Sequence, residues 1–305
     1  MAAIELDGVT KRFGDVTAVS DLDLTVPEGE VFGFLGPNGA GKSTTINMLL
    51  DFVRPTAGEV RVLGLDAGQE SVAVRRRTGV LPEGYDVYHR LTGRKHVEFA
   101  MRSKDVDGDP EAILERVGIA DAADRKAGGY SKGMRQRLVL GMALVGDPDL
   151  LVLDEPSSGL DPGGAREMRD IVRSEAESGA TVFFSSHVLG QVEAVCDRVG
   201  IMREGELVAE DSIDGLREAV EGGETLVITV DAASEDDLDA VRALDGVSNA
   251  ATDGGTVTVT CDADAKTAVI GALEEAGITV KDFQTEETSL EDLFLAYTEG
   301  KEVSV

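Results

Sequence analysis

Residues 36–44 read Gly36-Pro37-Asn38-Gly39-Ala40-Gly41-Lys42-Ser43-Thr44, a glycine-rich loop that ends in a lysine and two hydroxyl side chains. The apolar run 31–35 before it predicts a buried strand, and the run 46–50 after it predicts the start of a helix that must end before Pro55. Strand, glycine loop and helix in this order are typical of a phosphate-binding loop. The glycines let successive backbone N–H groups converge on an anion, and the helix start adds further unpaired donors.

Two side chains of this loop predict its ligand. Lys42 supplies a mobile positive charge for the β- and γ-phosphates of a nucleotide, and the Ser43 hydroxyl is a hard oxygen of the kind that Mg²⁺ prefers. The loop therefore predicts binding of ATP with Mg²⁺. A plain glycine-rich turn is the alternative, and the flanking strand and helix argue against it.

Composition limits the class of protein. The chain has 305 residues, 42% of them hydrophobic, which predicts about two domains with sizeable cores. It contains no apolar run of about 18 residues that could span a bilayer, and its first residues do not resemble a secretory signal. Cys196 and Cys261 have no partner motif, so we expect them to be reduced core residues of a cytosolic protein.

The formal net charge is −29, and the basic residues are 9 Lys and 20 Arg. The negative electrostatic field of such a charge disfavours loose binding to nucleic acid or to anionic lipid. Acid excess with few lysines favours a halophilic protein, because concentrated salt screens self-repulsion within about 3 Å at 1 M. An ordinary acidic cytosolic protein is the alternative, and full stability in dilute buffer would support it.

Two further apolar runs end in polar side chains. Residues 150–153 are all large and apolar and precede Asp154 and Glu155, as expected of a parallel strand whose carboxyl end faces a ligand. Asp154 can hold Mg²⁺, and Glu155 can accept a proton from an attacking water. Run 182–187 repeats this design and ends in His187, which can hydrogen-bond a γ-phosphate oxygen. His89 and His96 have no such setting and are predicted to lie on the surface.

The local sequence leaves two other positions open. Residues 4–35 predict a small antiparallel sheet that leads into the strand of the glycine loop, and Phe13 lies in its first turn region. Phe13 could stack on adenine or simply pack on that sheet. Ser131 precedes a helical run, where it could be an ordinary N-cap or part of a second anion site with the nearby Gly133.

Five motifs in a fixed order resemble the ATP-binding-cassette (ABC) ATPases over roughly residues 4–218. They are the phosphate-binding loop 36–44, the signature loop 130–134, the Walker B strand 150–155, the D-loop 158–161 and the switch residue His187. Phe13 lies where the family keeps its adenine-stacking aromatic residue. The resemblance implies an α/β fold: a RecA-like P-loop core with an antiparallel β subdomain and a helical subdomain at about 84–148.

The family mechanism, carried over, implies a head-to-tail dimer of ATPase subunits, either two identical copies or two related ones. ATP would lie between the loop 36–44 of one copy and Ser131, Gly133 and Asp161 of the other, so that binding closes the pair and hydrolysis opens it. Glu155, His187, Lys42 and Glu83 would then serve catalysis, and Ser43, Asp154 and Glu83 would hold Mg²⁺.

This chain departs from the family pattern at two places. Glu83 replaces the usual Q-loop glutamine, and it could reach Mg²⁺ while adding negative charge near the γ-phosphate. Lys132 and Met134 replace the usual Gly and Gln of the signature loop, and Lys132 could approach the phosphates or point to solvent. Both departures are similar to the export ATPases of the multidrug ABC-2 type, here expected to be haloarchaeal. That group implies a separate membrane permease and a location on the cytoplasmic face of the membrane.

Residues 222–305 are predicted to form a second domain after the ATPase domain 1–218. Runs 225–230, 256–261 and 278–283 predict strands, while 236–244 and 265–276 predict helices, an order that suggests a small βαββαβ ferredoxin-like sandwich. From 221 to 305 there are 20 acidic and 4 basic residues, which argues against RNA binding. Run 289–294 resembles the closing helix of the accessory domain in the same export group, where it could serve dimer contact or regulation, or only add solubility.

Two other functions remain open from the sequence. A soluble ABC ATPase acting on ribosomes or DNA would usually carry two cassettes or a long coiled-coil insertion, which this chain lacks. A non-hydrolysing, ATP-gated interaction protein would not need Glu155. The sequence therefore favours an ATP-hydrolysing export subunit, and the transported compound cannot be read from it.

Overall fold

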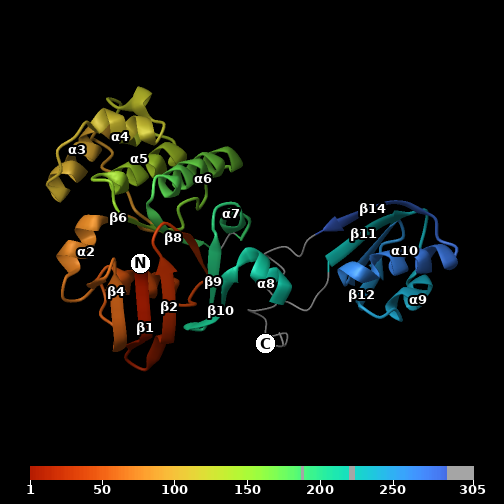
Figure 1. The fold of residues 1–305 in the computed structure, drawn as a ribbon. Helices are drawn as coiled ribbons and strands as arrows, with labels where there is room; N and C mark the ends of the chain where they lie inside the picture. Colours follow the sequence, from red (N-terminus) through yellow and green to blue (C-terminus); the bar gives the residue numbers. More distant parts are fainter. Residues whose placement is uncertain (187–188, 220–223, 287–305) are drawn as a thin grey trace. The chain divides into compact units, whose positions relative to one another are not determined.

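The computed structural model describes residues 1–186, 189–219 and 224–286 of the chain (Figure 1). The chain divides into two compact units, Met1–Ile213 and Asp214–Val305, and each is described by itself. His187 and the run 289–294 lie outside the described residues. Among the helices of the described ranges, none combines the length and apolar character needed to cross a bilayer.

A six-stranded sheet forms the centre of the first unit, with strand order β10-β9-β3-β8-β7-β6. Neighbouring strands from β9 to β6 are parallel, and β10 is added antiparallel at one edge. The strands β3, β7 and β8 are buried along their whole length, which explains their continuous apolar sequences. The bounds are β3 Val31–Leu35, β6 Thr78–Leu81, β7 Leu150–Asp154, β8 Thr181–Ser186, β9 Arg198–Arg203 and β10 Glu206–Ser212.

A second, antiparallel sheet of the same unit has the order β2-β1-β4-β5. Its strands are β1 Ala2–Phe13, β2 Val16–Pro27, β4 Ala57–Val62 and β5 Leu65–Asp66. The sequence predicted that a small antiparallel sheet leads into the strand 31–35, and β3, which follows β2 along the chain, pairs in parallel with β8 and β9 of the central sheet. Helix α1, Lys42–Leu49, contacts β2, β4 and β7, so it joins the two sheets through one apolar core.

Most helices of the first unit lie between its strands in the chain order. Figure 1 shows α3, α4 and α5 gathered into a helical group within the range 84–148. Ser131 caps α5 by accepting a hydrogen bond from the Met134 N–H over 3.2 Å. The helices of the unit are α2 Ser71–Arg77, α3 Gly93–Lys104, α4 Pro110–Arg116, α5 Lys132–Leu144, α6 Pro162–Glu177 and α7 Leu189–Glu193, with the 3-10 turns Ala120–Ala122 and Ala127–Gly129.

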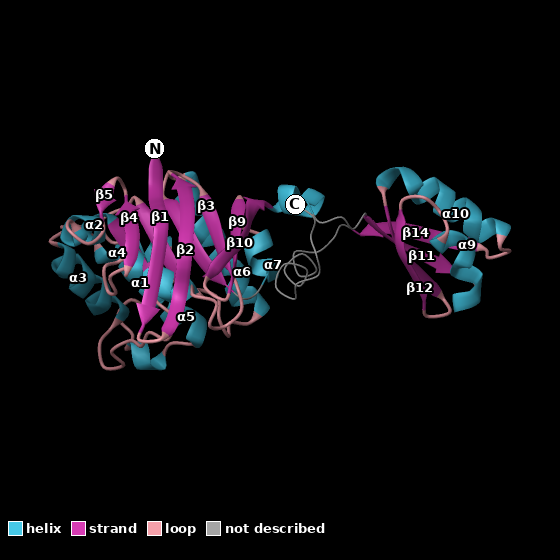
Figure 2. Cartoon of the chain, turned by 90° about the horizontal axis from the view of Figure 1, so that it is seen from below, coloured by secondary structure: helices cyan, strands magenta, loops and turns pink. Residues whose placement is uncertain are grey.

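The second unit begins within α8, Ile213–Ala219, and contains a four-stranded antiparallel sheet of order β12-β13-β11-β14. Two helices pack on one face of this sheet, as Figure 2 shows, and the chain order is βαββαβ, as predicted. The sequence did not locate β12. The elements are β11 Glu224–Val230, the 3-10 turn Glu235–Leu238, α9 Asp239–Arg242, β12 Val247–Thr252, β13 Thr256–Cys261, the 3-10 turn Ala263–Ala265, α10 Lys266–Glu275 and β14 Val280–Glu286.

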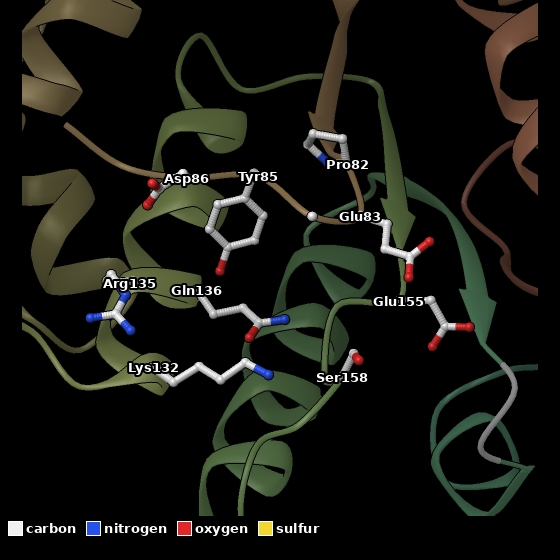
Figure 3. A pocket seen from close by; sticks show the side chains of 10 residues that line it. Pro82, Glu83, Tyr85, Asp86, Lys132, Arg135, Gln136, Glu155 and Ser158 are labelled. Carbon is white, nitrogen blue, oxygen red and sulfur yellow. The ribbon is translucent and has the colours of Figure 1, made fainter. Parts of the chain in front are cut away.

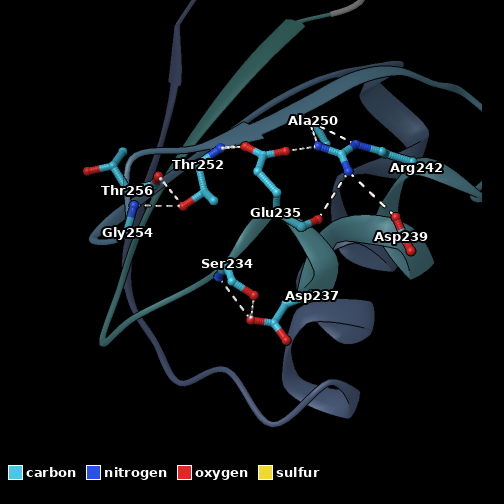
Figure 4. A network of polar contacts seen from close by, with 9 residues as sticks. All are labelled: Ser234, Glu235, Asp237, Asp239, Arg242, Ala250, Thr252, Gly254 and Thr256. Atoms are coloured by element: carbon cyan, nitrogen blue, oxygen red, sulfur yellow. Dashed lines mark hydrogen bonds and ion pairs between the residues drawn. The ribbon is translucent and has the colours of Figure 1, made fainter.

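A polar network connects the first helical turn of this unit to its outer hairpin (Figure 4). Glu235 accepts a hydrogen bond from the Thr252 N–H over 3.1 Å and pairs with Arg242, whose guanidinium also donates to the Ala250 carbonyl. Ser234 and Asp237 form a capping box at the start of the turn. The network fixes helix α9 against β12 at the edge of the sheet.

Candidate nucleotide-binding site

The loop between β3 and α1 adopts a conformation that only glycine permits at two places. Gly39 and Gly41 have φ values of 86° and 108°, in the left-handed region that side chains disfavour. A Cβ on Gly41 would lie 2.6 Å from the Ala18 carbonyl oxygen, so the loop also passes too close to β2 for a side chain. The Ala40 N–H donates to the Pro37 carbonyl over 3.1 Å and tightens the turn.

Lys42 begins α1 and turns back over this loop. Its ammonium donates to the Gly36 carbonyl over 2.6 Å and to the Pro37 carbonyl over 3.2 Å, and the residue is only 7% exposed. Burial lowers the pKa of Lys42 from its usual value, because the charged form loses water. Three carboxylates act on this pKa in the opposite direction, those of Glu155, Asp154 and Glu83.

The acidic pair lies where β7 ends beside β8. Asp154 accepts a hydrogen bond from the Ser185 hydroxyl at the end of β8, and the Glu155 N–H donates to the Ser185 carbonyl over 3.1 Å. Glu155 has φ 51°, a left-handed conformation that costs a non-glycine residue about 1–2 kcal/mol. Asp154 and Glu155 are 7% and 8% exposed, so both carboxyl groups sit in a largely water-excluded edge of the sheet.

One cavity of about 200 Å³ brings these groups together. The glycine loop, Glu83 and the acidic pair line it together. The lining residues are Ala18, Asn38, Gly39, Gly41, Lys42, Ser43, Thr44, Glu83, Asp154 and Glu155. A site with backbone donors, an ammonium and carboxylates suits a phosphate group that arrives with a divalent cation.

A second cavity, of about 360 Å³, shares Glu83 and Glu155 with the first (Figure 3). Lys132, Arg135 and Gln136 extend into it from the first turns of α5. Its remaining lining residues are Pro82, Gly84, Tyr85, Asp86 and Ser158. Burial raises the pKa of the Tyr85 hydroxyl, so this group stays protonated as a donor.

The structure places three predicted cofactor residues in a different hollow. Ser131, Gly133 and Asp161 line a third cavity of about 500 Å³, between the start of α5 and the start of α6, and they do not line the cavity that holds Lys42. The Asp161 carboxylate caps α6 by accepting from the Gly164 N–H over 2.7 Å. Within one chain these residues are therefore separate from the glycine loop.

Two aromatic predictions have different outcomes. Phe13 ends β1 with 49% of its surface exposed, under the Lys11 ammonium at 4.8 Å, and it does not line the cavity around Lys42. The prediction that His96 lies on the surface is wrong. His96 is 1% exposed, because its ring accepts a hydrogen bond from the Tyr88 N–H and contacts the Thr92 carbonyl through Nδ1.

Two residues of the site had no role predicted from the sequence. Ser185 holds the Asp154 carboxylate, and Ala18 contributes its carbonyl and lines the cavity from β2. A hydroxyl residue at the end of the strand beside β7 was the available signal for Ser185. Ala18 comes close only through the packing of two sheets, which the local sequence does not reveal.

Comparisons with known proteins agree with this geometry. The family model of the ABC transporter matches residues 19–158, and the model of the ATP-binding protein DrrA1-3-like C-terminal domain matches residues 212–298. The daunorubicin resistance ATP-binding protein DrrA3 of Streptomyces coeruleorubidus is 36% identical over 303 residues, covering 97% of this chain and 96% of that protein. This chain belongs to the ABC transporter ATP-binding proteins.

Other similarities support the same family. The bacitracin transport ATP-binding protein BcrA of Bacillus licheniformis is 38% identical over 217 residues, covering 70% of this chain and 71% of that protein. A solved ATP-binding subunit of an ABC transporter superposes with a TM-score of 0.65 at 26% identity, covering 71% of this chain and 92% of its own. The predicted ABC ATPase and its assignment to the DrrA and BcrA export group are confirmed, whereas the halophilic origin stays a prediction.

Proposed function

We propose that this ABC ATPase pairs with a second ATPase subunit and drives a separate membrane permease that exports a compound chosen by the permease. The observation that supports this most is the single cavity shared by Lys42, Glu83, Asp154 and Glu155. Relatives named for daunorubicin resistance, bacitracin transport and Nod factor export point in the same direction.

Within that cavity we assign the phosphates of ATP to the backbone of residues 36–44 and to Lys42. The oxygen ligands for Mg²⁺ would be Ser43, Asp154 and Glu83, which suit a hard cation, and Mg²⁺ would offset phosphate charge there. Asp154 fits this role because Ser185 occupies one carboxylate oxygen and leaves the other available. Glu155 is placed to accept the proton of an attacking water.

The remaining predicted residues complete the site from outside this cavity. His187 would hydrogen-bond the γ-phosphate, and Phe13 would stack on adenine, for which its exposed ring is available. Ser131, Gly133 and Asp161 lie in their own cavity and would meet the nucleotide of the paired subunit. This division of one site over two chains makes ATP part of the contact that closes the dimer.

The proposed permease surface is an apolar groove of about 430 Å³ beside α3 and α5. Three large aromatic side chains remain exposed along it, Phe52 at 63%, Tyr88 at 64% and Phe99 at 52%. Exposed aromatic clusters of this kind mark protein contacts, and here they stand out on a very acidic chain. Pro82, Tyr85 and Asp86 line both this groove and the second cavity, so a permease seated in the groove would contact the segment that carries Glu83.

The decisive experiment replaces Glu155 with Gln, which keeps the side-chain shape but removes the base. We expect phosphate release from MgATP to fall by about 10²–10⁴-fold, while MgATP binding remains and an ATP-bound dimer accumulates in sedimentation velocity. An unchanged hydrolysis rate would contradict the role of Glu155. Absence of MgATP binding by the folded native chain would contradict the proposed function as a whole.

A second experiment tests the groove. Phe99→Glu should abolish co-purification with a co-expressed ABC-2-type permease while leaving the hydrolysis rate of the isolated chain within about twofold, because Phe99 lines the groove and neither of the two cavities that Glu83 lines. Val16→Glu is the matched control, since Val16 is also exposed, at 66%, but lies on β2. Equal loss of permease binding in both variants would contradict this assignment.

A further inference from the structure

Lys132 occupies an unusual position for a residue of the signature loop. It is the first residue of α5, directly after the capping Ser131, and its side chain runs towards the 158–161 loop of the same chain. A Cβ built on Gly159 would lie only 2.1 Å from Lys132 Nζ, so the ammonium rests directly on that loop. Lys132 is solvent-exposed, but its ammonium lies against the 158–161 loop, and it does not line the cavity that holds Lys42.

The ammonium also borders the cavity behind the hydrolysis site. Lys132 and Gln136, four residues apart on α5, form one wall, and Glu83 and Glu155 stand across from them (Figure 3). All these groups line one hollow of about 360 Å³. Lys132 forms no ion pair with a carboxylate of the described residues, and it shares this cavity with the carboxylates of Glu83 and Glu155.

The same wall contains a buried acceptor that has no partner in the described structure. Gln136 is 3% exposed, its amide nitrogen donates to the Pro156 carbonyl, and its Oε1 accepts no hydrogen bond there. Figure 3 shows the carboxamide of Gln136 beside the end of the Lys132 side chain. Among the described residues Lys132 donates no hydrogen bond to this oxygen, but an ammonium has three donors, and a rotation of the exposed Lys132 side chain could bring one of them to it.

The charges around the two cavities suggest a role for Lys132. Glu83, Asp154 and Glu155 gather close to the place where ATP phosphates would bind, and Lys42 is the cation on the glycine-loop side. Negative charges this close together repel a further anion such as a phosphate group and so weaken its binding. Lys132 and Glu83 are also the two positions at which this chain carries opposite charges in place of the uncharged residues of the family motifs.

We propose that Lys132 is a positioning residue that acts within its own subunit, where its ammonium offsets the charge of Glu83 and holds the 158–161 loop beside Glu155. The inference rests on the proposed hydrolytic function of this cavity. The signature loop 130–134 would then act in both subunits. Lys132 would act within its own chain, whereas Ser131 and Gly133 are proposed to contact the nucleotide of the paired subunit.

A double-mutant cycle on the full chain tests the charge relation. Lys132→Met should lower kcat for MgATP about five- to tenfold when Glu83 is present, but less than about twofold in the Glu83→Gln background, with KM changed little. Lys95→Met is the control, because Lys95 is an exposed lysine of the first turn of α3 and should leave kcat unchanged. Met is a good helix former, and equal melting temperatures will show that each variant folds.

Hydrogen exchange without nucleotide tests the contact itself. Amides of residues 157–161 should exchange faster in Lys132→Met than in the native chain, and Lys132→Arg should restore their protection. This readout does not need hydrolysis, so failure of the proposed function and failure of this inference give different results. Equal kcat losses in both Glu83 backgrounds, a rise in KM alone, or unchanged exchange at 157–161 would each overturn the proposal.

Discussion

Replacing Ser185 with Ala removes one hydrogen bond whose consequences the structure defines closely. The Ser185 hydroxyl donates to Asp154 Oδ1 over 2.5 Å, joining the carboxyl ends of β8 and β7. Ser185 is 0% and Asp154 7% exposed, so water cannot readily replace the lost donor. The substitution leaves the backbone bond from the Glu155 N–H to the Ser185 carbonyl in place.

The expected magnitude follows from burial and charge. A hydrogen bond to a charged group contributes about 1.5–3 kcal/mol, and this one leaves a buried carboxylate oxygen without its donor. We therefore expect the free energy of unfolding to fall by about 2 kcal/mol. The orientation of Asp154 would also be lost, and such losses beside a metal ligand reduce metal affinity by about 10–100-fold.

The assay is phosphate release at saturating ATP, measured against Mg²⁺ concentration. Thr181→Val is the matched control, because the Thr181 hydroxyl, 1% exposed, accepts from the Gly29 N–H at the opposite end of the same strand. Both variants should be less stable, but only Ser185→Ala should need about tenfold more Mg²⁺ for half-maximal rate. If the two variants lose stability equally and neither shifts the Mg²⁺ requirement, Asp154 does not depend on Ser185 and the reasoning is wrong.

Two further predictions concern buried charge. Glu175→Gln should lower the free energy of unfolding by about 2 kcal/mol in denaturant melts, because Arg116 Nε donates to a Glu175 side chain that is 5% exposed. Glu98→Gln is the control, and at its exposed pair with Arg102 it should lower the free energy of unfolding by less than about 0.5 kcal/mol. Burial holds the pKa of Lys42 below 10.5 in the folded chain, so the unfolded chain binds more protons, and stability should rise as pH climbs from that lowered value towards 10.5. Lys42→Met should lose this rise as well as MgATP binding, and parallel pH curves for the two proteins would contradict the burial argument.

Much of the site could be predicted because its signals are local. A glycine loop between an apolar strand and a helix is encoded in adjacent residues, and the structure shows β3, loop and α1 in that order. The acidic pair follows a strand buried on both faces, and the carboxyl ends of parallel strands meet at one edge of a sheet. Local patterns of this type specify both the element and its end, so the cavity could be anticipated before its geometry was known.

Other features depend on contacts between distant segments. Strand β12 was not located, because it is an edge strand that pairs only with β13 and buries only Ala250 along its length, so its sequence lacks clear alternation. The burial of His96 comes from Tyr88, which folds back over the first turn of α3. The contact of Lys132 with Gly159 likewise joins α5 to a loop 27 residues away, which no short pattern can encode.

One short segment links the three surfaces on which the proposed function depends. Glu83 lines the nucleotide cavity, residues 82–86 line the cavity that Lys132 borders, and Pro82, Tyr85 and Tyr88 line the aromatic groove. Because these residues share a few consecutive peptide units, Glu83 cannot move towards or away from the phosphates without moving the groove wall. His96 fixes the far end of this segment through the Tyr88 N–H, and β6 fixes its start. Movement driven by ATP would therefore be confined to the stretch between two anchored ends, where the permease is proposed to bind.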